Sequence, residues 1–570
     1  VYKRQMSLFS SIRMASNTMR ADQIALQVIG QNIANAETPG YIREEIVLKP
    51  APIQKLGGLP LGLGVQVAAV IQKIDHFLEE RLRASVSDRA GAEVAEETYQ
   101  QLEGLIGELS DTDLSSDLTR FFSSISEVLN QPESVSARNL VVLQAQTLTQ
   151  NIRRLHERVN AIRSDLNKRV DDVADRINRL IEDIRRLNIQ IAETEGGDVS
   201  QSDAVGLRDQ RLQALEELAS LIDIRVEEQP SGGVAVYSSG FFLVYEGTSR
   251  EVAVARSTDR GLGISEVRLA ETDSPLEVYA GELYGLMRAR DSVLGNFLDR
   301  LNEFTAAMIY GFNRIHASGQ GLSGFTKLTS VEGVKDPTVA LNQAGLTFTP
   351  TNGSFLIQLQ NTRTGVTQTT RIRVDLTGLA KDTTLQDLAD QISAIDGLQA
   401  TIDSLGRLTI QCTGPDQVFS FAEDTSGVLA SLGLNTFFTG TGAGDIGVNK
   451  VLTQDPSKFA ASKNGIGVDT ETAVALAGFA DTPLSDYQGR SIHALYDQMI
   501  SEVTQGAAIS KAEAESARTF ESTLRGQKLA VSGVNLDEEV VKLIAFQQQF
   551  QVSARFIKTL NDLIQILVNI

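Results

Sequence analysis

Residues 8–33 of this 570-residue chain read LFSSIRMASNTMRADQIALQVIGQNI, and their spacing predicts a long amphipathic helix. Positions taken alternately four and three residues apart are apolar at seven of eight places, and the exception is Asp22. Heptad spacing of this kind is typical of helices that pair along one stripe. The row consists of Leu8, Ile12, Ala15, Met19, Asp22, Leu26, Ile29 and Ile33.

The other end of the chain carries the same spacing and is apolar at nine of ten positions. Since both rows need a partner, we expect the two terminal helices to pair and to bury side chains that contribute about 1.5–3 kcal/mol each. Neighbours such as Phe9, Val541 and Ile544 make the stripes wider than one pair requires, which predicts packing against copies or relatives of the protein. The C-terminal row is Leu536, Val540, Leu543, Gln547, Phe550, Ala554, Ile557, Leu560, Ile564 and Leu567.

A third heptad row runs from Leu148 to Ile191, and Arg169 is its one polar member among thirteen positions. Gly196 and Gly197 follow it and predict the end of the helix. Between the helical segments lie blocks of short alternating runs, which are typical of strands. We therefore expect an α+β fold that is predominantly α. It has paired terminal coiled-coil helices, a long helical bundle or rod, and β-rich inserted domains.

The pattern also gives domain boundaries. Residues 1–5 precede Met6 and are interpreted as a non-native leader. The N-terminal coiled-coil helix and its turn are expected at 6–50, and the C-terminal coiled-coil helix that pairs with it at 530–570. A helical rod domain is expected at 51–223, with helices that return to it at 281–324 and 449–529. The β-rich parts are a β subdomain at 224–280 and an outer insertion at 325–448. Within the insertion we expect a short helix near 385–395 and a hairpin turn at 405–407.

Composition excludes several classes of protein. With 52 basic and 72 acidic residues the net charge is −20, which argues against nucleic-acid binding because such binding relies on Lys and Arg. The single cysteine, Cys412, excludes an intramolecular disulfide framework and a Cys-rich zinc site. No apolar run is long enough to span a membrane, and no secretory signal is recognisable.

Sites of chemistry are absent from the pattern. The histidines, His76, His156, His316 and His493, have no second ligand at metal spacing. The run 442–447 has the letters of a dinucleotide fingerprint without the helix that should follow, and Asp111, Asp113 and Asp117 lack the Gly and Glu of a calcium loop. We therefore predict no enzyme activity, no catalytic or metal site and no cofactor, and we expect His316 to be structural.

The turn after the first helix carries a recognisable motif. Its residues Asn32, Asn35, Thr38, Pro39, Gly40, Tyr41 and Arg43 resemble the signature of bacterial flagellar axial proteins, which include rod, hook and hook-associated subunits. The segment 532–539 and the Gln-rich helix after it are similar to the matching C-terminal signature. Interior stretches at 131–138, 207–211 with the strands after it, 281–291 and 313–319 resemble the hook-associated proteins in particular.

This resemblance, over about residues 6–320 and 450–570, implies an extracellular structural adaptor that joins hook to filament. It implies export through the flagellar type III apparatus, a ring of copies, contacts with hook protein and with the next hook-associated or filament-side protein, and an export chaperone on the C-terminal helix. It implies no nucleic acid and no membrane insertion. The expected assembly interface is Leu8, Ile12, Met19, Leu26, Ile29, Ile33, Leu536, Val540, Leu543, Phe550, Ile557, Leu560, Ile564 and Leu567.

Three alternatives stay open at this point. Another axial subunit of hook or rod type would share both terminal signatures, although the long helical region at 90–222 argues against hook protein. An intracellular coiled-coil scaffold is compatible with the single cysteine. An enzyme carried on the insertion is disfavoured because residues 325–448 show no clustered His, Cys or paired acids.

Overall fold

The computed structural model describes residues 2–56, 59–107, 113–196, 203–378 and 381–568. It divides into two compact units, each built from segments that are distant in sequence. Unit 1 comprises Val1–Glu97, Ser164–Arg290 and Ile509–Ile570, and unit 2 comprises Thr98–Arg163 and Asp291–Ala508. Helices α2 (His76–Gly107), α4 (Val135–Glu195) and α12 (Ile492–Ser532) contribute residues to both units.

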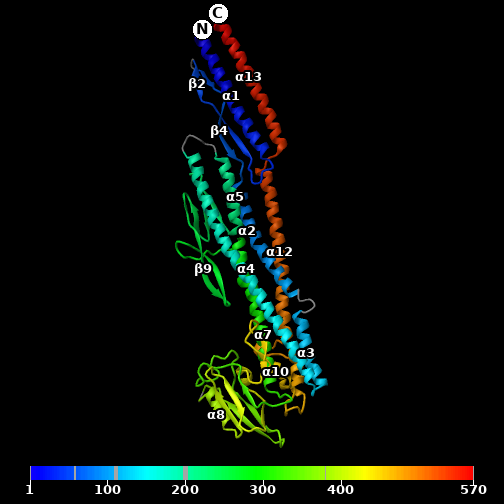
Figure 1. Ribbon diagram of the computed structural model, residues 1–570. Coiled ribbons are helices and arrows are strands. Elements are labelled where there is room, and N and C mark those ends of the chain that lie inside the picture. Colours follow the sequence, from blue (N-terminus) through cyan, green and yellow to red (C-terminus); the bar gives the residue numbers. More distant parts are fainter. Residues whose placement is uncertain (1, 57–58, 108–112, 197–202, 379–380, 569–570) are drawn as a thin grey trace. The chain divides into compact units, whose positions relative to one another are not determined.

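In unit 1 the two terminal helices, α1 (Tyr2–Ala34) and α13 (Leu536–Val568), lie side by side (Figure 1). They run antiparallel, with the end of α1 beside the start of α13. This confirms the predicted pairing of the two ends of the chain. The other helices of this unit are α5 (Val205–Leu221) and α6 (Gly281–Arg288).

The strands of unit 1 form small antiparallel sheets. Strand β1 (Glu44–Pro50) pairs with β4 (Val65–Gln72), and the hairpin β2 (Ile53–Leu56) and β3 (Leu59–Gly62) lies between them in sequence. A four-stranded sheet contains β5 (Arg225–Glu228), β6 (Val234–Ser238), β7 (Phe241–Tyr245) and β8 (Thr248–Ser249). A separate hairpin pairs β9 (Val252–Asp259) with β10 (Leu262–Leu269).

The long heptad row of α4 is buried as its spacing predicts. In unit 1 its members Leu166, Val173, Ile177 and Ile184 are at most 3% exposed. The polar exception, Arg169, is half-buried and forms ion pairs with Glu97 at 3.0 Å and Glu282 at 3.7 Å. A charged residue is tolerated in this row because its partners lie at the edge of the same core.

Unit 2 has an aromatic helical core. It contains α3 (Leu114–Asn130), α7 (Leu294–Ala317) and α11 (Glu471–Ala477), and the π-helical turn η1 (Ala289–Val293) leads into α7. The rings of Phe121, Phe312, Phe437 and Phe438 lie with their centroids 4.8–5.7 Å apart. This core joins α3 and α7 to the segment at 437–438, so it brings together three separate stretches of the chain.

The β-rich insertion is confirmed and has its own core within unit 2. One sheet has the order β13 (Thr367–Val374), β12 (Gly353–Asn361), β16 (Gln417–Ala422), and the other has the order β11 (Lys327–Thr329), β15 (Leu408–Cys412), β14 (Leu398–Ile402). Helix α8 (Leu385–Ser393) begins with a capping box between Thr384 and Asp387, and a tight turn joins β14 to β15, as predicted. Short elements complete the unit: α9 (Val428–Leu432), β17 (Phe438–Thr439), β18 (Gly447–Val448), α10 (Lys450–Gln454), η2 (Pro456–Lys458), η3 (Phe479–Asp481) and η4 (Ser485–Tyr487).

The run 442–447 follows β17 and ends on Gly447, the first residue of β18, so the helix that a dinucleotide fingerprint requires does not begin there. Asp111 lies outside the described residues, while Asp113 caps α3 by accepting a hydrogen bond from the backbone of Ser116. The boundaries of the domains proposed from sequence stay predictions.

Candidate assembly interface

The heptad row of α1 is visible in the burial of its side chains. Ala15, Asp22 and Ile29 are spaced by seven residues, and each is at most 4% exposed. The remaining predicted members are half-buried: Leu8, Ile12, Met19, Leu26 and Ile33. Other buried residues of α1, including Ala21, Ala25, Val28 and Asn32, do not belong to the predicted row, so the buried face of the helix is wider than that row.

The buried row of α13 differs from the predicted one at its start and in its middle, where Gln547 is exposed while Phe546 is half-buried and Ser553 is buried. Leu536 and Val540 are 47% and 43% exposed and lie outside it, whereas Glu539 is 1% exposed. The row that the structure shows is Glu539, Leu543, Phe546, Phe550, Ser553, Ile557, Leu560 and Ile564, all buried or half-buried. Counting apolar residues misses Glu539 and Ser553 because both are polar. The side chain of Leu567 lies outside the described residues.

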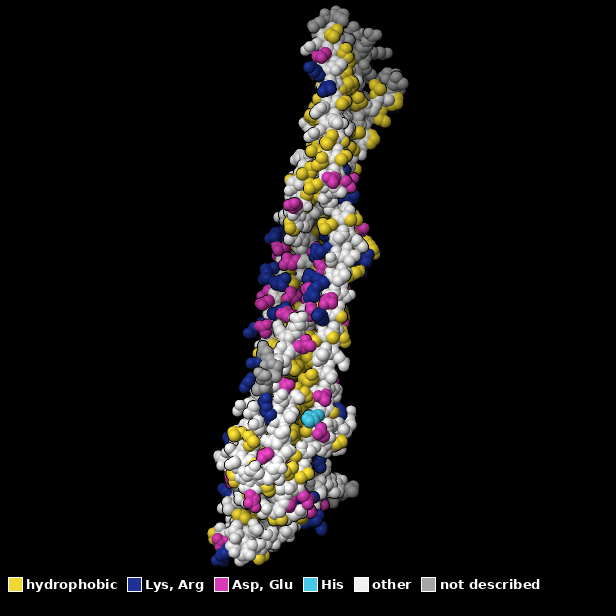
Figure 2. Space-filling model, turned by 90° about the vertical axis from the view of Figure 1, so that its right-hand side faces the viewer, with side chains coloured by type: hydrophobic (Ala, Val, Ile, Leu, Met, Phe, Trp, Pro, Cys, Tyr) yellow, Lys and Arg dark blue, Asp and Glu magenta, His cyan; other side chains and the backbone are white. Residues whose placement is uncertain are grey.

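A second apolar stripe of α13 faces outward. Its eight large side chains are each 40–67% exposed, and in Figure 2 hydrophobic side chains gather along the terminal helices. The members are Leu536, Val540, Val541, Ile544, Val552, Phe556, Leu563 and Ile566. Several exposed large apolar side chains gathered on one helix are characteristic of a protein contact site.

The turn after α1 redirects the chain toward the strands. Thr38 accepts a backbone hydrogen bond from Tyr41 and donates its own N–H to Asn35 O at 2.9 Å. Its hydroxyl lies 3.2 Å from Asn35 Oδ1. Pro39 precedes Gly40, whose φ of 79° lies in the left-handed region that glycine tolerates. The motif residues at this turn thus fix a tight reversal.

Asn32 connects the turn, the first strand and α13. Its side chain is 1% exposed and uses all of its hydrogen-bonding capacity. The amide nitrogen donates to Glu44 O at 3.0 Å and to Glu539 Oε2 at 3.1 Å, and the amide oxygen accepts from Glu44 N and from the Tyr41 hydroxyl, both at 2.9 Å. Any other side chain would leave buried polar groups unpaired.

Arg43 provides the second link to α13. Its side chain lies 2.9 Å from Glu538 Oε2 and 2.7 Å from Glu539 Oε1, and its backbone N–H donates to Ser532 O at 2.9 Å. Lys542 adds a contact of 3.3 Å to Glu539. Glu539 is the buried residue of this contact that the apolar pattern does not predict, and the signal that could have found it is a carboxylate four residues before Leu543 in the heptad row.

Burial shifts the titration of the groups around this turn. It raises the pKa of Glu44 and, together with the charges of Glu44, Asp209 and Glu539, that of Tyr41. It also raises the pKa of Asp209 to about 6, although Gln72 donates a 2.5 Å hydrogen bond to this carboxylate. The turn is therefore held by a half-buried polar cluster with acidic character.

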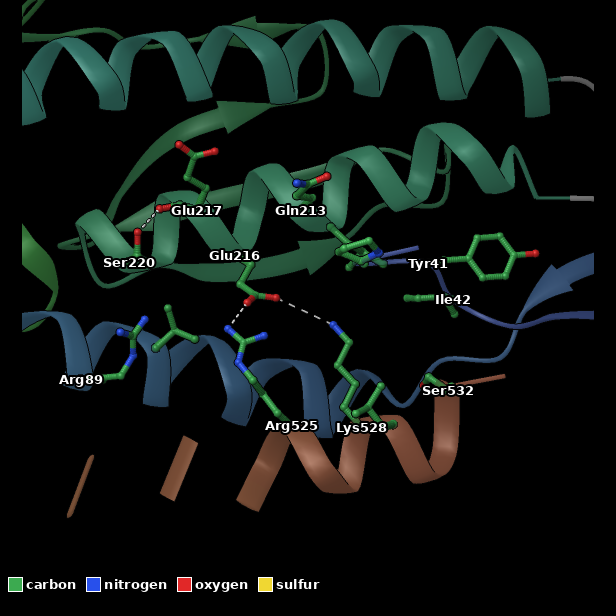
Figure 3. Close-up of a pocket in the computed structure, with 16 residues that line it drawn as sticks. Tyr41, Ile42, Arg89, Gln213, Glu216, Glu217, Ser220, Arg525, Lys528 and Ser532 are labelled. Atoms are coloured by element: carbon green, nitrogen blue, oxygen red, sulfur yellow. Dashed lines mark hydrogen bonds and ion pairs between the residues drawn. The ribbon is translucent and has the colours of Figure 1, made fainter. Parts of the chain in front are cut away.

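A cavity of about 460 Å³ lies in unit 1 between the turn, α2, α5 and α12. Figure 3 shows Glu216 of α5 pointing toward Arg525 and Lys528 of α12. Lys528 also pairs with Glu79 at 2.9 Å, and Arg89, which lines the cavity too, pairs with Glu93 at 2.9 Å. Because these charged side chains already pair with one another, we interpret the cavity as a gap where the helices pack together and not as a ligand site.

Groups that could perform chemistry do not converge in the described part of the chain. No three His, Cys, Asp or Glu side chains among the described residues come together as a metal site would require. His316 is fully buried: its Nδ1 lies 2.8 Å from Asn435 O, and its Nε2 accepts from Ala460 N at 3.0 Å. Burial lowers its pKa to about 4.

No described helix is long and apolar enough to cross a membrane.

Three family models match parts of the chain. The one described as the flagellar hook-associated protein FlgK helical domain covers residues 99–328. Those described as flagellar basal body rod FlgEFG protein C-terminal and flagella basal body rod protein cover residues 525–570 and 12–41. The last two coincide with the terminal helices and the turn.

Curated relatives cover most of the chain. Flagellar hook-associated protein 1 of Escherichia coli (strain K12) is 24% identical over 98% of this chain and 100% of its own length, and the Salmonella typhimurium protein of that name gives the same figures. The protein of that name from Bacillus subtilis (strain 168) is 26% identical over 56% of this chain and 69% of its own length. The flagellar hook junction protein FlgK from Burkholderia pseudomallei, a solved structure, has a TM-score of 0.49 and 14% identity, covering 80% of this chain and 100% of that one.

Proposed function

The chain belongs to the flagellar hook-associated protein family, and we propose that it joins hook to filament by assembling through its paired terminal helices. It is a structural subunit of the bacterial flagellum and not an enzyme. The observation that carries the mode of assembly is the outward stripe of α13. A helix pair that covers only one of two apolar stripes needs a further partner for the other.

Copies of the same chain are the first partners of this stripe. Each copy buries its Glu539–Ile564 row against its own α1 and offers the outward stripe to a neighbouring copy. Repeating this contact from copy to copy closes a ring. Hook protein contacts one side of the ring, and the next hook-associated or filament-side protein contacts the other.

The same stripe explains why the chain would need an export chaperone. Eight exposed large apolar side chains on one helix promote aggregation before assembly, so a partner must cover α13 until the chain is secreted. The chain then reaches the outside of the cell through the flagellar export apparatus and folds where it assembles.

A pair of double variants tests the proposal. Val541 and Val552 of the stripe are 67% and 66% exposed, and we replace both by Ser. The control replaces Val468 and Val366, which are 71% and 66% exposed in unit 2, in the same way. In cells that lack the natural protein, the control should restore filaments, whereas the stripe variant should be secreted but shed its filaments.

The secretion measurement separates assembly from export. Accumulation of the stripe variant in the culture medium as a folded monomer supports the proposal. A stripe variant that attaches filaments as well as the wild type contradicts it. Truncation before Val534 is a coarser version of the same experiment, and it should leave a folded monomer that cannot assemble.

A further inference from the structure

A second cavity of unit 1, of about 590 Å³, is lined by three arginines, Arg83, Arg208 and Arg211. It lies between α2, α5 and the first strands of the four-stranded sheet. The carboxylates that line it are Glu79, Glu80, Asp203 and Glu228, and His76 lies at its wall. The three arginines differ sharply in how their charges are compensated.

Arg83 is buried without a partner. Its side chain is 8% exposed, yet no described residue forms a hydrogen bond, an ion pair or a ring contact with it. A guanidinium carries five N–H donors, and leaving a buried charge unpaired is strongly unfavourable. Burial lowers the pKa of Arg83 despite the attraction of Glu79, Glu80 and Glu216. Its environment therefore lacks an anion at bonding distance.

The carboxylates of the cavity wall are mostly engaged elsewhere. Lys528 contacts both oxygens of Glu79, at 2.9 and 3.1 Å. Glu228 accepts from Arg208 at 2.7 Å, and Asp203 accepts from the backbone of Gln72 at 3.1 Å. Glu80 is exposed to solvent.

Arg208 is saturated, whereas Arg211 adds charge to the cavity. Arg208 pairs with Glu195, Glu228 and Asp203 at 2.7, 2.7 and 3.9 Å. Arg211 is 4% exposed and, within the described part of the chain, donates to two neutral acceptors, Asn188 Oδ1 and Gly232 O. Burial, together with the charge of Arg208, lowers the pKa of Arg211 to about 10.

We infer that this cavity binds a small oxyanion through the Arg83 guanidinium, with Arg211 as a second positive charge. A carboxylate or phosphate presents two oxygens in the geometry that the guanidinium fork matches. The oxyanion is either free in solution or a carboxylate that a second copy of the chain inserts. This inference rests on unit 1 alone, so it can fail while the proposed function stands.

Titration with inorganic phosphate tests the first source. The wild-type full chain should show saturable binding at millimolar phosphate and a raised Tm, relative to chloride at the same ionic strength. Arg83→Gln should bind at least ten-fold more weakly. Arg225→Gln is the control, because the Arg225 side chain is 73% exposed and pairs with Glu227 of the same strand, β5. It should bind like the wild type.

Self-association tests the second source. If a second copy supplies the carboxylate, phosphate should have little effect on Tm, and Arg83→Gln should weaken concentration-dependent association where Arg225→Gln does not. If neither binding nor association distinguishes the two variants, the inference is overturned.

The stability of the variant provides an independent readout. Without added anion, Arg83→Gln should unfold at the same or a higher temperature, because it removes an uncompensated charge. A clear fall in Tm in chloride would mean that Arg83 has a partner within the chain, and this would overturn the inference. If Arg83→Gln fails to fold, Arg83→Lys replaces it, keeps the charge and should still weaken phosphate binding.

Discussion

The Arg43 guanidinium lies 2.7 Å from Glu539 Oε1 and 2.9 Å from Glu538 Oε2. In sequence, 495 residues separate Arg43 from Glu538. Arg43 belongs to the turn after the first helix, and Glu539 to the first turns of the last one. Both are buried, at 6% and 1% exposure. The ends of the chain are therefore joined by a specific polar lock as well as by apolar packing.

We predict that Glu539→Ala loosens the terminal helices. It leaves the Arg43 charge and the Asn32 amide without their buried acceptor, which should cost about 3–5 kcal/mol. Hydrogen exchange of the α1 and α13 amides measures this loss directly. Glu538→Ala is the matched control, because the Glu538 side chain is 57% exposed and should contribute below about 1 kcal/mol. Equal effects of the two substitutions would contradict the assignment.

Asp22→Asn should have the opposite effect. Asp22 is 1% exposed, its Oδ2 has no hydrogen-bond partner in the described structure, and burial raises its pKa above the model-compound value of 3.8. Removing the charge should stabilise the helix pair at neutral pH by on the order of 1 kcal/mol. Hydrogen exchange of α1 should slow, while Asp562→Asn, at an exposed position of α13, should leave it unchanged.

The pH dependence of the Asp22 contribution follows from the same burial. Burial raises the pKa of Asp22 in the folded chain, so protonation of Asp22 favours the folded state. This contribution to stability is complete below the unfolded pKa of 3.8 and is lost as the pH rises through the folded pKa. Wild-type α1 should therefore gain protection, relative to Asp22→Asn, as the pH is lowered. A difference between the two proteins that does not change with pH would contradict this account.

Heptad counting was sufficient to predict the terminal pair and the long helix α4, because each repeats one apolar face over many turns. It failed at Ser553, which is buried in the middle of α13, and at the start of that helix, where Glu539 is buried and the apolar Val540 is exposed. A polar residue becomes buried there only because Arg43 and Asn32 reach it from a distant segment. Periodicity within one helix carries no information about such partners.

The two cavities of unit 1 show the same limit. The motif at 207–211 was visible in the sequence, but nothing in it distinguishes Arg208, which three carboxylates surround, from Arg211, which has neutral partners. Arg83 lies in an ordinary alternation of acidic and basic residues on α2. Its burial depends on α5 and the strands, which pack from more than a hundred residues away.

Gly281→Ala should disrupt unit 1 locally. Gly281 starts α6 with a φ of 90°, and a Cβ there would lie 2.5 Å from Leu221 O. Backbone strain and the clash together should cost more than about 3 kcal/mol. Gly263→Ala in β10 is the control, because a Cβ there would meet nothing within 4 Å. Thermal unfolding should separate the two, and similar Tm values would show that the backbone near Leu221 adapts.

His316 should make unit 2 sensitive to acid. Its folded pKa of about 4 lies below the ordinary histidine value of 6.5, so the unfolded chain binds a proton that the folded chain excludes. Stability should therefore fall as the pH is lowered from about 6.5 to 4, by on the order of 3 kcal/mol from this group alone. In the folded state, protonation would remove the hydrogen bond that Nε2 accepts from Ala460 N.

Hydrogen exchange of α7 as a function of pH isolates this contribution from that of the carboxylates. His316→Gln should lower stability at neutral pH and should flatten the pH dependence between 6.5 and 4 relative to the wild type. His493→Gln is the control, since the His493 side chain is 44% exposed, and it should keep the wild-type slope. If His316→Gln and the wild type lose protection in parallel, the buried imidazole is not the titrating group, and acid acts on unit 2 through its carboxylates.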